Sequence, residues 1–161
     1  MRFAPAAAAL SLLLATTTSV TSAGPLEIDP RAETLVQEGR AALAAGETQA
    51  AIDAFEAAFA VDPAYTPIFI DLAEAARADG LQGKAIVYYR EALDRDPDNF
   101  AAISGEGEAL VEKGALEKAM RNLARLESLC GSSCPETMAL QASIDAGPAA
   151  RLAAEEGSAS P

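Results

Sequence analysis

The sequence repeats itself at an interval of 34 residues between about residue 32 and residue 131. Residues at this interval are similar in kind, and in most columns also in size, in the columns Leu35/Phe69/Ile103, Gly39/Ala73/Gly107, Gly46/Gly80/Gly114, Ala51/Ala85/Ala119, Ile52/Ile86/Met120, Phe55/Tyr89/Leu123 and Ala58/Ala92/Leu126. A repeat of this length is one supersecondary unit, which cannot bury its apolar face alone. The sequence therefore predicts an array of stacked units that share a continuous core.

Each unit has the pattern of two helices joined by a glycine turn. In the second unit, apolar and small residues recur at helical spacing at Phe69, Leu72, Ala73 and Ala76. Thr66 is a suitable N-cap, and Pro67 fits the first helical position. Gly80 ends this helix, and Asp96-Pro97 stops the following one, because proline cannot continue the hydrogen-bond ladder. The pattern predicts an all-α fold.

The repeat resembles the tetratricopeptide repeat (TPR) family. The shared features are the 34-residue period, a bulky residue early in the first helix, a small residue four positions later, a glycine turn, an alanine followed by an aromatic residue, and a closing proline. The resemblance implies a right-handed solenoid of three helix-turn-helix repeats, at residues 32–65, 66–99 and 100–133.

Two features depart from the family pattern. Glu38 and Glu106 stand where the second unit has Leu72, a position that is commonly apolar in the family. Gly105 and Gly107 lie within one predicted helix, and each should weaken it by about 1 kcal/mol relative to alanine. The array is therefore expected to be looser at its ends than in its middle.

An end repeat needs a cap with a polar outer side. Residues 134–146 predict such a capping helix, with Ser133 and Glu136 spaced as a capping box and Leu140 and Ile144 on its apolar face. Residues 147–161 are expected to form a short helix and a disordered tail.

The first 23 residues have the features of a secretory signal peptide. Met1-Arg2 is a short positive start, an apolar run follows, and Thr21-Ser22-Ala23 offers small residues for cleavage after Ala23. Because the run is shorter than the ~20 residues that a membrane span needs, an uncleaved anchor is the weaker alternative. We expect a short linker at 24–31, no membrane span after cleavage, and a periplasmic (or secreted) bacterial protein.

Composition excludes several classes of function. The chain has 12 basic and 24 acidic residues, a net charge of −12, and no histidine. Nucleic-acid binding is not expected, because it depends on clustered Lys and Arg that neutralise phosphates. Without histidine, and with two cysteines, no structural zinc site of four Cys and His ligands can form. No nucleophile has an evident partner base, so we expect no enzymatic activity and no cofactor.

Cys130 and Cys134 are the reactive candidates. In an exported chain the simplest interpretation is a disulfide that ties the cap to the array. A thiol-dependent redox protein or a soft copper(I) site is the alternative function, although the spacing is not Cys-x-x-Cys and no third ligand lies nearby. Asp94, Asp96 and Asp98 resemble the start of a calcium loop, but Asn99 and Gly105 stand where a Gly and a Glu are required.

The resemblance implies a concave groove lined by the first helix of each repeat. Its predicted lining is Val36, Arg40, Leu43, Ile70, Glu74, Arg77, Ser104, Glu108 and Val111. An apolar stripe and two outward-facing arginines would suit an amphipathic segment of an unidentified protein or peptide with some basic character. The Lys/Asn set with which some TPR domains clamp a C-terminal carboxylate is absent. The alternative is that these residues form solvated helix faces without a ligand.

Overall fold

The computed structural model describes residues 28–147, so the predicted signal peptide and the tail beyond residue 147 lie outside the described residues. The described part contains seven helices and no strand. They are α1 (Pro30–Ala44), α2 (Thr48–Val61), α3 (Ile68–Ala78), α4 (Gln82–Arg95), α5 (Phe100–Glu112), α6 (Leu116–Cys130) and α7 (Pro135–Ala146). The all-α expectation is confirmed.

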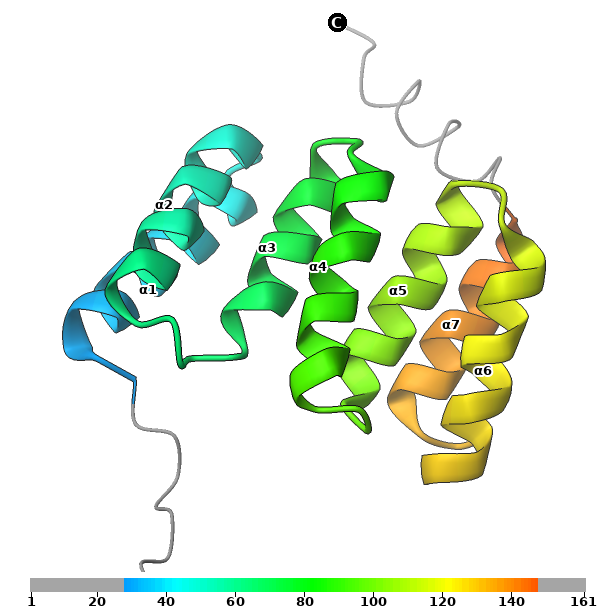
Figure 1. The fold of residues 1–161 in the computed structure, drawn as a ribbon. Helices are drawn as coiled ribbons and strands as arrows, with labels where there is room; N and C mark the ends of the chain where they lie inside the picture. Colours follow the sequence, from blue (N-terminus) through cyan, green and yellow to red (C-terminus); the bar gives the residue numbers. More distant parts are fainter. Residues whose placement is uncertain (1–27, 148–161) are drawn as a thin grey trace, which may run out of the picture.

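The helices form antiparallel pairs that stack side by side along one direction (Figure 1). Each helix packs against the helix before and after it, and the first helices α1, α3, α5 and α7 also pack in succession. Helix α7 contacts both α5 and α6, so it occupies the place of the first helix of a further repeat. The predicted cap therefore extends the row of first helices.

The turns between paired helices depend on glycine. Gly46, Gly80 and Gly114 have φ angles of 78°, 74° and 78°, in the left-handed region that glycine adopts without steric cost. Their 34-residue spacing is thus explained by backbone geometry.

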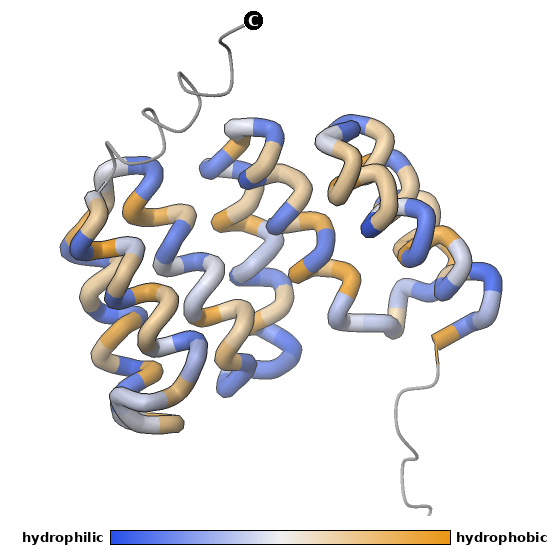
Figure 2. Tube along the Cα trace, turned by 180° about the vertical axis from the view of Figure 1, so that it is seen from behind, coloured by the Kyte–Doolittle hydropathy of each residue, from blue (hydrophilic) through white to orange (hydrophobic). Residues whose placement is uncertain are grey.

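Buried apolar residues from successive helices form the core. Hydrophobic and hydrophilic segments follow one another along the chain trace (Figure 2). The largest buried side chains include Tyr89, Phe55 and Ile52, while Leu140 of α7 joins a second cluster with Ile103 and Leu126. Met120 departs from its column, because its side chain is 55% exposed. Within residues 28–147 no further helix pair packs beyond α6 and α7, so this position is left uncovered.

The glycines inside the helices are sites of close packing. A Cβ atom on Gly39 would lie 2.5 Å from the Phe55 ring, and one on Gly107 would lie 2.6 Å from Leu140. A Cβ atom on Gly105 would overlap the ring of Tyr89. The lower helix propensity of these glycines is therefore offset by contacts that a larger residue would prevent.

Gly105→Ala should consequently destabilise the protein by about 2 kcal/mol, because the new methyl group displaces a buried ring. The matched control is Gly83→Ala in α4, where the nearest atom is Lys113 Nζ at 3.5 Å. That change should be neutral or stabilise by about 0.5–1 kcal/mol. Urea unfolding measures both, and equal effects of the two substitutions would contradict the packing role of Gly105.

Glu106 is buried, at 8% exposure, but it is fully engaged in hydrogen bonds. Arg90 Nε donates to its Oε1 at 2.7 Å, and Asn122 Nδ2 donates to its Oε2 at 3.0 Å. This network joins α4, α5 and α6, so a polar residue is accommodated where the family pattern has an apolar one.

Two predicted caps are wrong. Helix α3 begins at Ile68 without a side-chain cap from Thr66, and α7 begins at Pro135 with Cys134, not Ser133, at the N-cap position. Cys134 has extended backbone angles and is tied to Cys130, so the first helical residue is Pro135, whose missing N–H costs nothing there.

Candidate functional site

A cavity of about 300 Å³ opens between α3, α5 and α7. It is lined by Glu74, Arg77, Tyr89, Ala101, Ser104, Gly105, Glu108, Pro135, Glu136 and Ala139. A second cavity of about 370 Å³ shares Glu74 and Arg77 and continues to Ala78 and Glu112. Four of the predicted groove residues, Glu74, Arg77, Ser104 and Glu108, therefore lie together around one depression.

Arg77 lines both cavities and is engaged in ion pairs. Its guanidinium is 2.9 Å from Glu108 and 2.6 Å from Glu112, and its side chain is 21% exposed. Burial opposes the charged form, yet the hydrogen bond to Glu112 and the charge of Glu108 hold the pKa of Arg77 above its ordinary value. The expectation of an outward-facing positive point is wrong, because Arg77 ties α3 to α5.

Arg40 has a similar role in the preceding repeat. Its Nε and Nη2 atoms donate to the two carboxylate oxygens of Asp71 at 2.9 and 3.0 Å, in a bidentate pair that joins α1 to α3. This hydrogen bonding raises the pKa of Arg40. Asp71 is buried, so Arg40 compensates a carboxylate in the structure before any ligand arrives.

Glu74 differs from the other carboxylates near these arginines. Within residues 28–147 it takes part in neither ion pair, although it lines both cavities. Glu74 is exposed on α3. Partial desolvation and repulsion by Asp71 raise the pKa of Glu74, against the attraction of Arg77 and Arg40. The carboxylate of Glu74 therefore remains available to a ligand.

Ser104 joins the last two first helices. Its Oγ lies 3.2 Å from Glu108 Oε1 and 3.0 Å from the backbone carbonyl oxygen of Glu136. Since the side chain is buried, its role is to hold α7 beside α5. It shapes the cavity wall.

The predicted apolar stripe is not continuous. Val36 and Val111 are each 2% exposed and belong to the core, so they cannot contact a ligand. Leu43 and Ile70 are half-buried. Ile70 lines a separate cavity of about 290 Å³ with Thr66, Pro67, Ala92, Arg95, Asp96 and Asn99. The prediction that these two valines line the groove was wrong because the periodicity of the sequence does not show which side chains of neighbouring helices cover them.

Sequence reasoning missed six lining residues, which are Tyr89 of α4, Ala101 and Gly105 of α5, and Pro135, Glu136 and Ala139 of α7. A signal for α7 was present, since Pro67, Ala101 and Pro135 are spaced by the repeat length. Tyr89 reaches the cavity from a second helix because Gly105 leaves room for its ring.

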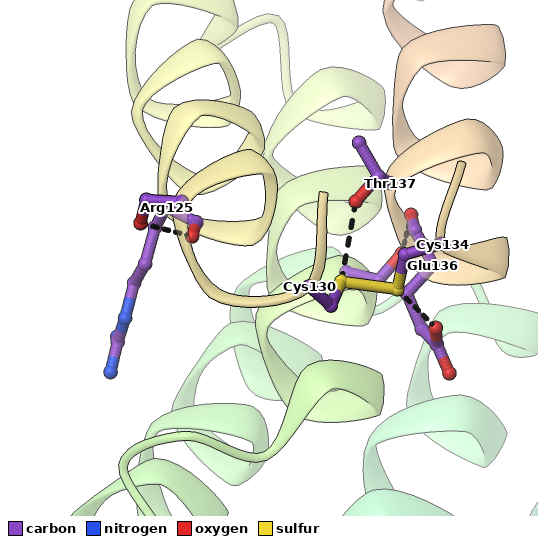
Figure 3. Close-up of a disulfide and its surroundings, with 7 residues drawn as sticks. Arg125, Cys130, Cys134, Glu136 and Thr137 are labelled. Atoms are coloured by element: carbon purple, nitrogen blue, oxygen red, sulfur yellow. Dashed lines mark hydrogen bonds between the residues drawn. A yellow bond between two sulfur atoms is a disulfide. The ribbon is translucent and has the colours of Figure 1, made fainter. Parts of the chain in front are cut away.

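Cys130 and Cys134 lie at disulfide distance, with their Cα atoms 5.8 Å apart. Figure 3 shows the pair at the junction of α6 and α7, with Thr137 Oγ1 3.6 Å from Cys130 Sγ and Glu136 beside Cys134. The pair therefore adjoins the wall of the main cavity. Over the described range, no three His, Cys, Asp or Glu side chains are grouped as metal ligands, and no helix has the length and apolar character of a membrane span.

The family model for the tetratricopeptide repeat matches residues 32–65 and 67–99. These are the first two predicted units. A comparison with curated protein sequences gives no match.

Several solved structures are similar. The TPR domain of Sgt2 from Aspergillus fumigatus is 28% identical, with a TM-score of 0.60, over 83% of this chain and 87% of that one. PcrH, solved in complex with the chaperone binding region of PopB, is 23% identical, with a TM-score of 0.61, over 71% of this chain and 92% of that one. MamA is 24% identical, with a TM-score of 0.53, over 71% of this chain and 58% of the MamA chain. PcrH and MamA thus support the fold alone.

Proposed function

We propose that the chain is a non-catalytic adaptor that binds a segment of another protein along the face of its first helices, because two of its repeats match the tetratricopeptide repeat model and its fold is that of TPR proteins. The observation that carries the proposal is the cavity between α3, α5 and α7, which brings charged, aromatic and small side chains of four helices to one surface. Such clefts between helices are common binding sites. PcrH, which shares the fold, was solved with a bound region of PopB.

We place this adaptor in an exported compartment, the bacterial periplasm being the simplest. Two features support this location: the signal-like sequence at residues 1–23 and the disulfide distance between Cys130 and Cys134. Disulfides persist in oxidising compartments and are rare in the cytosol.

Filling the cavity tests the binding site. Ala139 is exposed and lines the cavity, so Ala139→Trp should block the groove without disturbing the core. The matched control is Ala124→Trp, at an exposed position of α6. In pull-downs from the exported fraction with identification by mass spectrometry, partners of the wild type should be lost with Ala139→Trp and kept with Ala124→Trp. Partners retained by both variants would show that binding uses another face.

The state of Cys130 and Cys134 distinguishes the proposed adaptor function from the alternative of a redox or copper protein. Protein purified from an oxidising compartment should have no free thiol in a thiol titration and no stoichiometric copper. The double substitution Cys130→Ser/Cys134→Ser should cost at most about 2 kcal/mol, because so small a ring removes few conformations from the unfolded chain. Native free thiols or bound copper would favour the alternative.

A further inference from the structure

We propose that the cavity between α3, α5 and α7 binds a lysine or arginine side chain of the partner segment. This inference rests on the proposed function and deepens it, since it gives the chemistry that the groove selects. The partner is therefore a cationic segment.

The charges around the cavity carry the inference. Glu74, Glu108 and Glu136 stand against one guanidinium, Arg77, which leaves a surplus of two negative charges. Arg77 is directed to Glu108 and to Glu112 in the adjoining cavity. Glu74 and Glu136 are thus the carboxylates outside this ion-pair network, and they belong to helices on either side of α5. A cation between them would be attracted by both walls.

The uncharged part of the lining fits the stem of such a side chain. Ala101, Pro135 and Ala139 are exposed and give the cavity a small apolar surface, while Tyr89 lines it from a buried position. Lysine and arginine cover apolar surface with their methylene groups and keep the charged end among polar partners. An anchor that is only apolar would place no charge against the surplus carboxylates, and an acidic residue would be repelled.

The partial desolvation of Glu74 points the same way. Desolvation and the nearby Asp71 disfavour its charged form, and an incoming cation would compensate both. Because neither Glu74 nor Glu136 belongs to the ion pairs that tie the helices, Glu74→Gln/Glu136→Gln should leave helicity and melting temperature unchanged.

The test uses a phage-displayed library of random 12-residue peptides, selected on the full chain. Enriched peptides should share a lysine or arginine, and their selection should fail on Ala139→Trp protein. The strongest peptide is then synthesised with its basic residue intact or replaced by Gln, and binding is measured by fluorescence anisotropy. Removing the basic residue, or making Glu74→Gln/Glu136→Gln, should each weaken binding roughly tenfold. The two changes together should weaken it less than the product of the two effects.

The control is Glu117→Gln, which removes one charge at an exposed position of α6 and should leave the affinity unchanged. Groove-dependent peptides that lack a basic residue, or additive effects in the double-mutant cycle, would overturn the cationic preference while upholding the peptide-binding function. A library that yields no peptide sensitive to Ala139→Trp would instead contradict the proposed function itself.

Discussion

Replacing Arg77 with Glu is expected to lower the free energy of unfolding by roughly 3–5 kcal/mol, the usual cost of breaking a buried ion pair. The substitution would leave Glu108 and Glu112 without their guanidinium and would add a third carboxylate beside them. Because these side chains are at most 23% exposed, water compensates little of the lost interaction. Urea unfolding followed by circular dichroism measures the effect.

Arg121→Glu is the matched control for this prediction. Arg121 is exposed on α6 and donates to the backbone carbonyl oxygen of Glu117, so reversing its charge should change stability by less than about 0.5 kcal/mol. If Arg77→Glu were as mild as the control, the guanidinium would face solvent, as expected from the sequence, and would be available to a ligand.

Raising the pH from 10 to 12 should remove roughly 2–3 kcal/mol of stability through Tyr89 alone. Burial raises the pKa of Tyr89 from 10.0 to about 12, although the nearby Arg77 opposes this shift. Since the folded-state pKa is the higher one, the contribution is fully present below pH 10. It is lost as pH rises toward 12, because the unfolded chain releases its proton first.

Tyr89→Phe isolates this contribution, because the other groups that titrate at high pH are common to both proteins. The difference in unfolding free energy between wild type and Tyr89→Phe should therefore change across pH 10–12 and stay constant below pH 9. A constant difference throughout would mean that the Tyr89 hydroxyl is not held in a desolvated environment.

Most of the fold follows from the sequence. The helix pairs, the glycine turns and the burial of Ala51, Ala85 and Ala119 all lie where the 34-residue period predicts them. These features depend on residues close together in the sequence and recur in each unit, so the pattern of one unit predicts the structure of the next. Met120 of α6 is an exception, since it is 55% exposed while Ile52 and Ile86 of the same column are buried, and within residues 28–147 no helix pair follows α6 and α7.

The spacing of charged residues in the sequence is consistent with the ion pairs between successive repeats. Arg40 and Asp71 are 31 residues apart, and so are Arg77 and Glu108, which places each arginine against the first helix of the next repeat. The period alone gave no reason to prefer these partners over solvent or a ligand, because many carboxylates lie along the same faces. The predicted outward position of Arg77 was wrong for this reason, whereas Arg40 is exposed as predicted although it pairs with Asp71.

The sequence by itself therefore determined the helices, their pairing and the face on which a groove would lie, because periodicity and glycine conformation act over short distances. The tertiary structure decided which of that face's residues are available. Stacking buries Val36 and Val111, engages both arginines with carboxylates of the next repeat, and brings Tyr89 and α7 to the cavity. A long side chain such as that of arginine has several carboxylates within reach on neighbouring helices. Which carboxylate it pairs with depends on interatomic distances that are set only when the helices pack.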